Sequence, residues 1–425
     1  MASLMRASAM PRTVSWPLRV TAQPTPREVF DGYCAYEATL SVPSWQTGDP
    51  PYATEGGQWT RDDAPVRNEP SRLVLTLPRR AMPAGGFPVV VFVRTGGGGD
   101  RPLVERGVHG MGGALLTPGS GPAQEFAREG FAGASWDGPH GGLRNVTRGD
   151  EQFLMFNVGN LAALRDNVRQ SALEAVLLTQ LLSELRVDVS MCPGAVAPGN
   201  MARLDATVMA LMGHSMGASI APLAVAFEPR YRALLLSGAG GSWIENVLHK
   251  QHPVAVRPFA EALLGYTGTG SRLAEDDPSL TMLQWALERS DVPLFAGRVA
   301  PRHVLMMQGI VDHYILPPIA NAASLSLGLD LAGPSLDAAN MNLTSYDPLA
   351  RVLPLRGLAT RDGAVSANRM GATMLVRQYA EDGLEDGHEV VFQTERPKRD
   401  YRCFLRGLAM GAPTVPGYDA RDCGG

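Results

Sequence analysis

The sequence predicts an α/β fold in which a mostly parallel sheet is covered by helices on both faces. Short apolar runs of strand length alternate with helical stretches such as residues 161–185, an alternation typical of parallel sheets. With 425 residues, of which 45% are hydrophobic and 19% charged, the chain can bury a large core. No second core is evident, so we expect one elaborated domain over residues 33–412 rather than two or three domains.

The expected strands follow one another along most of the chain. The first two are separated by a stretch rich in Gly, Pro, Asp and Thr at residues 44–70, which predicts a long surface loop. Six further runs of mainly apolar residues carry the strand pattern. In chain order, the eight expected strands cover residues 33–42, 71–77, 88–93, 131–136, 206–212, 231–237, 302–308 and 373–379.

Two intervals between strands are longer than a plain helical crossover. Residues 238–298 follow the sixth strand and contain many leucines and four large aromatic side chains, Trp243, Phe259, Tyr266 and Trp285. Insertions at the carboxyl ends of strands build the ligand pocket of open α/β sheets. We therefore expect a helical cap or lid over residues 238–298, and a second excursion over residues 317–370.

The two ends of the chain carry little pattern. Residues 1–32 are expected to be disordered or extended, and residues 413–425 to form a C-terminal tail. Residues 1–23 lack the continuous apolar region of a signal peptide. No apolar stretch approaches the length that crosses a bilayer, so we expect no integral membrane segment.

The four cysteines leave the cellular compartment open. In an exported chain, Cys34 with Cys192 and Cys403 with Cys423 would be one of three possible pairings. In a cytosolic chain the same residues would be ordinary thiols. A periplasmic or extracellular location is slightly favoured if the cysteines pair, and a cytoplasmic one otherwise. Because no C-x-x-C pair exists, a zinc or redox site has little support.

The pentapeptide Gly213-His214-Ser215-Met216-Gly217 lies between an apolar strand and an Ala-rich helical stretch. A serine hydroxyl becomes an effective nucleophile when it has an adjacent base, donors for the developing oxyanion and a place on a tight turn. The two glycines permit that turn, and the helix that begins at Met216 directs its N–H groups at the reaction centre. The pattern predicts a nucleophile elbow at Ser215, and the alternative is a small residue in a glycine turn.

Two further polar residues follow expected strands later in the chain. Asp312 comes after strand 302–308, and His388 comes after strand 373–379. Asp312 could instead cap a helix that starts near Ile315. The competing acids are Asp330 and Asp337, and the competing bases are His313 and His140.

Together these segments resemble the α/β-hydrolases of the serine esterase and lipase type over residues 33–412. The resemblance implies that Ser215 is the nucleophile, Asp312 the orienting acid and His388 the general base. Many lipases and esterases carry a His-Gly pair after the third strand, whereas this chain has Thr95-Gly96 there.

The expected oxyanion donors are the backbone N–H groups of Met216 and Gly97, with Gly96 as the neighbour. The candidate pocket residues are Thr95, His214 and Trp243. Because neighbouring side chains of a strand point in opposite directions, a structural role is favoured for His214.

The resulting hypothesis is a serine hydrolase that cleaves carboxylic esters through an acyl-enzyme. The aromatic and leucine content of residues 238–298 favours short to medium acyl or aryl esters. The alternatives are an amidase or peptidase, an acyltransferase with the same triad, or a non-catalytic binding module on this fold.

No cofactor or metal is expected. His388-Glu389 lacks the second histidine of the H-E-x-x-H zinc motif, and the glycines at 96–99 lack the Gly-Lys-Ser/Thr ending of a phosphate loop. The net charge is -4 and no basic stripe exists, so nucleic acid is not an expected partner. The expected partner is a small-molecule ester, and the sequence does not predict an oligomeric state.

Overall fold

The computed structural model describes residues 17–60, 62–97 and 99–423. The chain forms two compact units. The first comprises the described residues within 17–106, 118–212 and 223–232, and the second comprises those within 107–117, 213–222 and 233–423. The single domain expected over residues 33–412 therefore stays a prediction.

The first unit contains a mixed sheet. Its strand order is β1-β2-β3-β5-β4-β7, and β6 pairs with β7. The pairs β1–β2, β2–β3 and β3–β5 are antiparallel, whereas β4–β5 is parallel, with Val90 opposite Gly133. These strands are β1 (Arg19–Val29), β2 (Tyr33–Ser44), β3 (Arg67–Pro78), β4 (Phe87–Val93), β5 (Ala132–Trp136), β6 (Arg186–Asp188) and β7 (Met201–His214).

The longest helix of the first unit is α5 (Leu161–Glu184), which matches the expected helix 161–185 to within one residue. Its N-cap Asn160 accepts a hydrogen bond from the N–H of Ala163, which satisfies one of the free donors of the first turn. The other helices of this unit are α2 (Pro102–Glu105), α3 (Pro122–Arg128), η2 (Gly142–Arg144), α4 (Glu151–Met155) and η3 (Pro198–Asn200).

The second unit contains parallel strands in the order β8-β9-β13-β10-β11. Their side chains are buried almost throughout β8, β9 and β13, as expected of a parallel sheet covered on both faces. A separate two-stranded sheet joins β12 to β14. The strands are β8 (Tyr231–Ser237), β9 (His303–Ile310), β10 (Asp330–Ala332), β11 (Thr360–Arg361), β12 (Val365–Ser366), β13 (Met374–Ala380) and β14 (Thr414–Val415).

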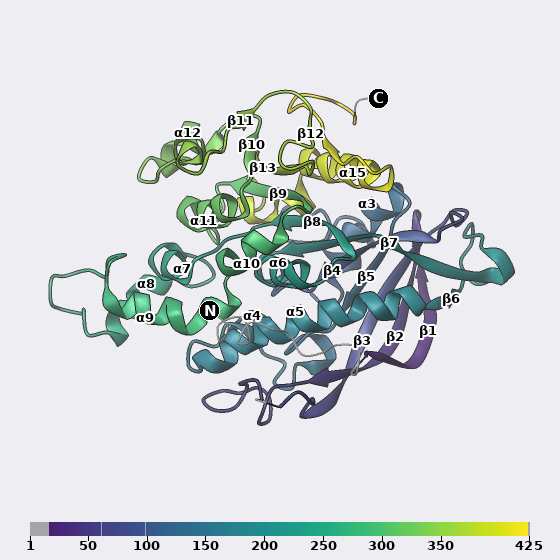
Figure 1. Ribbon diagram of the computed structural model, residues 1–425, viewed down its shortest axis with the longest axis horizontal. Coiled ribbons are helices and arrows are strands. Elements are labelled where there is room, and N and C mark those ends of the chain that lie inside the picture. The colour runs from purple at the N-terminus through teal and green to yellow at the C-terminus, as the bar shows by residue number, and fades with distance from the viewer. Residues whose placement is uncertain (1–16, 61, 98, 424–425) are drawn as a thin grey trace. The chain divides into compact units, whose positions relative to one another are not determined.

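Helices follow most strands of the second unit. In the stretch from 238 to 298, helix α7 packs on α8 and α9, and α10 packs on α11 (Figure 1). The helices are α6 (Met216–Phe227), α7 (Trp243–His249), α8 (Val256–Leu263), α9 (Pro278–Leu287), η4 (Glu288–Ser290), α10 (Val292–Val299), α11 (Pro317–Leu327), α12 (Leu336–Ala339), η5 (Met341–Leu343), α13 (Leu349–Val352), η6 (Leu353–Arg356), η7 (Gly387–Glu389), α14 (Val390–Gln393) and α15 (Glu395–Ala409).

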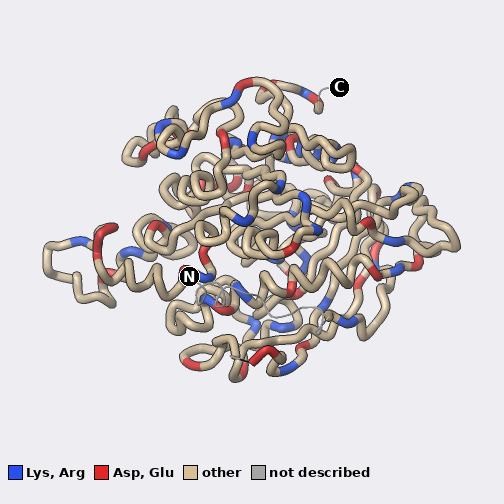
Figure 2. The backbone as a smooth tube through the Cα atoms, in the orientation of Figure 1, with Lys and Arg blue, Asp and Glu red and all other residues tan. Residues whose placement is uncertain are grey.

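The predicted α/β class is confirmed, and all eight expected strands are present as β2, β3, β4, β5, β7, β8, β9 and β13. The long interval 238–298 is helical as expected. In the described part of the chain, positively and negatively charged residues are interspersed along the backbone (Figure 2). Among the described residues, no helix is both long and apolar enough to span a membrane.

Several short or irregular strands were not expected. β1 lies within residues 1–32, of which 1–16 are outside the described residues. It contains Pro24 and Pro26. These prolines are tolerated because β1 pairs only with β2 and is therefore an edge strand. β14 lies within the expected C-terminal tail, and β10 and β11 lie within the excursion 317–370. With two or three residues each, these last three strands carry no detectable periodicity.

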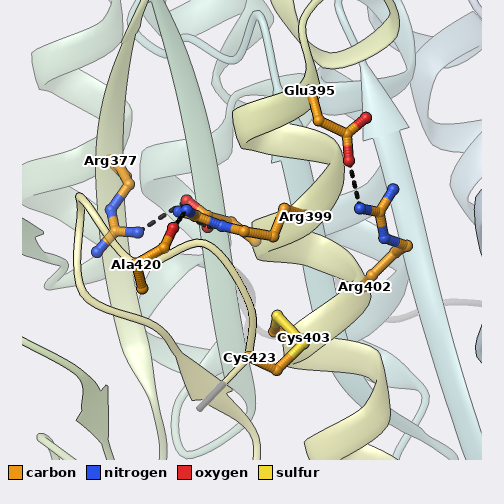
Figure 3. Close-up of a disulfide and its surroundings, with 8 residues drawn as sticks. Arg377, Glu395, Arg399, Arg402, Cys403, Ala420 and Cys423 are labelled. Carbon is orange, nitrogen blue, oxygen red and sulfur yellow. Dashed lines mark hydrogen bonds and ion pairs between the residues drawn. A yellow bond between two sulfur atoms is a disulfide. The ribbon is translucent and has the colours of Figure 1, made fainter.

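Two disulfides join the cysteines as Cys34–Cys192 and Cys403–Cys423, which is the pairing considered for an exported chain. Each bridge lies within one compact unit. The second bridge ties the end of the described chain to α15 (Figure 3).

A buried ion cluster reinforces the same corner of the second unit. Arg377 of β13 and Asp400 of α15 are both fully buried, with 2.7 Å between Nη1 and Oδ2. The hydroxyl of Tyr379 donates to the same oxygen at 2.9 Å, and Arg399 contacts the other oxygen at 2.5 Å. Arg377 also donates to the carbonyl of Pro416 at 2.8 Å. The cluster therefore fastens α15 and the C-terminal segment to the sheet.

We predict that Asp400→Ala lowers the free energy of unfolding by about 3–5 kcal/mol, because it leaves buried guanidinium groups without their carboxylate. The matched control is Glu395→Ala, which breaks the contact with Arg402 on the same helix (Figure 3). The Glu395 side chain is 68% exposed, so this change should cost less than about 1 kcal/mol. Denaturant unfolding of both variants measures the difference, and equal costs would contradict the role of the cluster.

Candidate active site

Ser215 occupies a sharp turn between β7 and α6. Its φ angle is +53°, in the left-handed region that residues other than glycine rarely adopt. The N–H of Ser215 donates to the carbonyl of Ser237 at 2.9 Å, and its carbonyl accepts from Ala218 at 2.9 Å. The strand, turn and helix predicted around this serine are therefore present.

The first glycine of the pentapeptide is required by a close approach of the backbone. A Cβ atom at Gly213 would lie 2.3 Å from the carbonyl oxygen of Gly217. No side chain fits at that distance, so residue 213 must be glycine for the turn to close. The left-handed backbone conformation of Ser215 is thus stabilised by its hydrogen bonds to Ser237 and Ala218 and by the close approach of Gly213 to Gly217.

Asp312 follows β9 and is buried. Its Oδ1 accepts hydrogen bonds from the N–H groups of Tyr314 and Ile315, both at 2.8 Å, and its Oδ2 lies 2.9 Å from Nδ1 of His388. Oδ1 of Asp312 therefore caps the turn at Tyr314 and Ile315, while Oδ2 contacts His388. The capping role and the contact with the histidine are compatible.

The environment of Asp312 favours its charged form. Burial alone would raise the pKa of this carboxyl. The His388 imidazole, the N–H of Ile315 and the ammonium of Lys250 outweigh burial and lower the pKa below its usual value. Asp312 is therefore ionised at neutral pH and can hold a positively charged imidazole.

His388 lies in η7 and is buried between two other rings. Tyr314 stacks on it with ring centroids 4.4 Å apart and planes 18° apart. The ring of His214 is tilted by 53° to that of His388, with 4.6 Å between the centroids. The imidazole is thus fixed by stacking as well as by its hydrogen bond to Asp312.

Gly238, directly after β8, lies next to both His388 and the residue that contacts the backbone of Ser215. A Cβ atom at Gly238 would lie 2.6 Å from Cε1 of His388, so only glycine leaves room for the ring. Gly238 directly follows Ser237, whose carbonyl accepts the N–H of Ser215. The serine and the histidine therefore both lie at the carboxyl end of β8. Neither Gly238 nor Tyr314 was expected to have a role in the site, although Gly238 follows a predicted strand as the other site residues do.

The competing histidines have other partners. His313 is 44% exposed, and its Nδ1 lies 2.6 Å from Oδ2 of Asp386. His140 belongs to the first unit, where its Nε2 lies 3.3 Å from the amide oxygen of Asn167, and burial lowers its pKa to about 4.

The competing acids also have structural partners. Asp330 binds Arg361 at 2.8 Å and the amide of Asn368 at 3.0 Å. Asp337 accepts from the hydroxyl of Ser335 at 2.6 Å and from the N–H of Leu349 at 2.7 Å. Each carboxylate therefore organises its local surroundings, whereas the carboxylate that contacts His388 is that of Asp312.

The candidate oxyanion and pocket residues are divided between the two units. Met216 begins α6, next to Ser215. Thr95, Gly96 and Gly97 follow β4 in the first unit, and Gly97 has a φ of +68°. Because these three residues belong to a different unit from Ser215, their roles stay predictions.

His214 and Trp243 occupy different surroundings. His214 is fully buried, and its ring lies 4.7 Å from that of Phe392 as well as on His388. This agrees with the structural role favoured for it. Trp243 begins α7 and is half-buried, and its backbone N–H donates to the side-chain oxygen of Gln284 at 2.7 Å.

The aromatic residues of the 238–298 stretch differ in their exposure to solvent. Its core is formed by Val247, Leu248, Leu273 and Leu280, with Tyr266 packed against it. Phe259 is 49% exposed and Trp285 is 78% exposed. These two rings lie on α8 and α9, and they remain accessible to solvent.

Two groups of side chains in the described residues have the donor atoms of a metal site. One consists of His214, His388 and Glu389, and the other of Glu245, His249 and Glu275. The first includes the histidine whose Nδ1 already contacts Asp312. In the second, His249 lies 3.2 Å from Glu245 one turn away on α7, as a surface ion pair would. The expectation that no metal is needed stays a prediction.

No family model and no curated protein matches the sequence. An acetyl xylan esterase from Paenibacillus sp. matches with a TM-score of 0.45 and 15% identity, over 76% of this chain and 83% of that chain. A glucuronoyl esterase from Teredinibacter turnerae matches with a TM-score of 0.44 and 15% identity, over 96% and 83%. One from Caldicellulosiruptor kristjansonii matches with a TM-score of 0.43 and 13% identity, over 95% and 81%. These three solved esterase structures are thus similar to this chain at low sequence identity.

Proposed function

We propose that this protein is a serine hydrolase that cleaves carboxylic esters through an acyl-enzyme. The observation that carries the proposal is the buried contact between Asp312 and His388, placed at the end of the strand to which the backbone of Ser215 is bonded. Such a constellation of nucleophile, base and orienting acid is identified by geometry and roles.

In the proposed mechanism, the two nitrogens of His388 have different roles. The Nδ1–H group donates a hydrogen bond to the carboxylate of Asp312, which leaves Nε2 as the atom that can take the proton of the Ser215 hydroxyl. The serine oxygen then attacks the ester carbonyl, and the imidazolium that forms is stabilised by the ionised Asp312. The same proton is passed to the alkoxide leaving group, and water hydrolyses the acyl-enzyme with His388 again as base.

The developing oxyanion needs two donors. We propose the backbone N–H of Met216, at the start of α6, as one of them, because a helix N-terminus carries free N–H groups and partial positive charge. The second would come from Gly97, with Gly96 beside it.

An amidase, peptidase or acyltransferase would use the same three residues. The relative turnover of a matched ester and amide distinguishes an amidase or peptidase from an esterase, because an amine is a poorer leaving group than an alcohol. Product analysis with an added alcohol distinguishes the third. A non-catalytic module would hydrolyse none of these substrates. We also propose that the protein is exported, because both disulfides persist in oxidising compartments.

We predict that Ser215→Ala removes nearly all ester hydrolysis without changing the melting temperature, because alanine is as small as serine and adds no clash in the turn. A fluorophosphonate probe should label Ser215 in the wild type and nothing in the variant. Labelling at another serine, or unchanged turnover in Ser215→Ala, would refute the assignment.

We predict that Asp312→Asn lowers kcat by about 10³–10⁴-fold, because a neutral amide favours the wrong tautomer of His388. Steady-state kinetics on a chromogenic ester measure the loss. The control is Asp330→Asn, which changes a structural carboxylate bound to Arg361. Its kcat, calculated per folded molecule, should stay close to that of the wild type. A larger loss in the control than in Asp312→Asn would place the acid elsewhere.

We predict that short to medium acyl or aryl esters are preferred over long-chain triglycerides, and that the 238–298 stretch sets this preference. Alanine substitution of Trp243, the half-buried aromatic residue nearest the end of β8 in the chain, should change the acyl-length profile more than it changes acetate hydrolysis. The exposed Trp285 is the matched control. Equal profiles for both variants would argue against a role of Trp243 in acyl selection.

A further inference from the structure

Lysine is rare in this chain, and one of its lysines contacts the candidate site. The sequence contains 38 lysines and arginines together, and only Lys250 and Lys398 among them are lysines. Lys398 is buried in α15, whereas Lys250 is the half-buried C-cap residue of α7. Nearly all other basic side chains of this sequence are arginines, so a lysine at position 250 is unusual for this chain.

Lys250 joins the helical stretch 238–298 to the loop that carries the acid. Its ammonium donates to the carbonyl of Tyr314 at 3.1 Å. A second contact lies beside it, since the N–H of His252 donates to the carbonyl of His313 at 3.3 Å. Tyr314 in turn stacks on His388 and donates its N–H to Asp312. A single side chain thus holds the residue that contacts both Asp312 and His388.

The charge of Lys250 acts on the same carboxylate as the charge of His388. Burial lowers the pKa of Lys250 to about 8, and the negative charge of Asp312 opposes that shift. The Lys250 ammonium likewise helps to lower the pKa of Asp312. When His388 takes a proton, two cations therefore share one carboxylate.

Other charged groups on α7 and on the loops after β9 and β13 have partners of their own. On α7 itself, Glu245 lies 3.2 Å from His249. After β9, His313 is paired with Asp386 from the loop after β13 at 2.6 Å. Glu389, one residue after His388, lies 3.8 Å from His214. Asp312 is the carboxylate whose negative charge acts on Lys250.

We propose that Lys250 is a positioning residue for the reaction: it holds Tyr314 against His388 and shares the negative charge of Asp312 with the imidazolium. The inference rests on the proposed function of Ser215, Asp312 and His388. A lysine suits this role better than an arginine, because its single ammonium reaches one carbonyl oxygen without the five donors of a guanidinium. The consequence is that the helical stretch over residues 238–298 influences how readily His388 is protonated.

The test compares pH profiles of kcat/KM for Lys250→Met, Lys250→Arg and Lys250→Gln. Removing the positive charge leaves Asp312 free to stabilise the imidazolium more strongly, so the protonated, inactive form persists to higher pH. We expect the midpoint of the acidic limb to move up by about 0.5–1 pH unit in Lys250→Met and Lys250→Gln. Lys250→Arg keeps the charge and should keep the wild-type midpoint.

Glutamine can still donate to the carbonyl of Tyr314 and methionine cannot, so their difference in kcat at the pH optimum isolates the loss of the hydrogen bond. The matched control is Arg257→Met on α8, which removes a positive charge paired with Glu261 in the same stretch. It should leave the midpoint unchanged. If Lys250→Met does not fold, Lys250→Gln carries the charge test alone.

A wild-type midpoint in both neutral variants would overturn the inference, even if kcat or stability falls, because a purely structural role does not move the midpoint. Fluorophosphonate labelling of Ser215 in the same preparations separates this failure from failure of the proposed function. Labelled Ser215 with an unmoved midpoint refutes only the role of Lys250. A wild type that is not labelled at Ser215 refutes both.

Discussion

The buried negative charge of Asp312 is the constraint on which the candidate site depends. An ionised carboxylate taken out of water is stable only when hydrogen bonds and opposite charges replace its hydration. Here two N–H groups of its own loop satisfy one oxygen, and His388 satisfies the other. Because the imidazole comes from a segment 76 residues later in the chain, the need to satisfy this charge holds two distant loops together.

The backbone makes that contact possible. A Cβ atom at Gly309 would lie 1.7 Å from the carbonyl oxygen of Gly387, and one at Gly387 would lie 2.3 Å from the carbonyl oxygen of Val311. The loops after β9 and β13 therefore lie backbone against backbone, and the N–H of Gly387 donates to Val311 at 2.9 Å. Asp386 adds a side-chain link, since its carboxylate accepts from the N–H of His388 at 2.8 Å and contacts His313. The site is thus rigid because glycines let its supports approach.

Much of this arrangement follows from the sequence, because parallel strands place their carboxyl ends at one edge of a sheet. Strand runs long enough to show a continuous apolar pattern were all predicted, and Ser215, Asp312 and His388 each follow one of them. The sequence pattern misses β6, β10, β11, β12 and β14, whose two or three residues are too few for periodicity, and β1, whose prolines argue against a strand. It also misses Tyr314 and Lys250, because their roles come from stacking and from a carbonyl contact between distant segments. The exposure of Phe259 and Trp285 shows that aromatic content alone does not locate a pocket.

The scarcity of lysine has a practical consequence for chemical mapping of the protein. Complete cleavage after Lys250 and Lys398 divides the chain into residues 1–250, 251–398 and 399–425. Cys34–Cys192 lies within the first fragment and Cys403–Cys423 within the third, so no disulfide links one fragment to another. Ser215 falls on the first fragment, whereas Asp312 and His388 fall on the second. An adduct on the nucleophile and an adduct on its base therefore separate by mass after one digestion, with both disulfides intact.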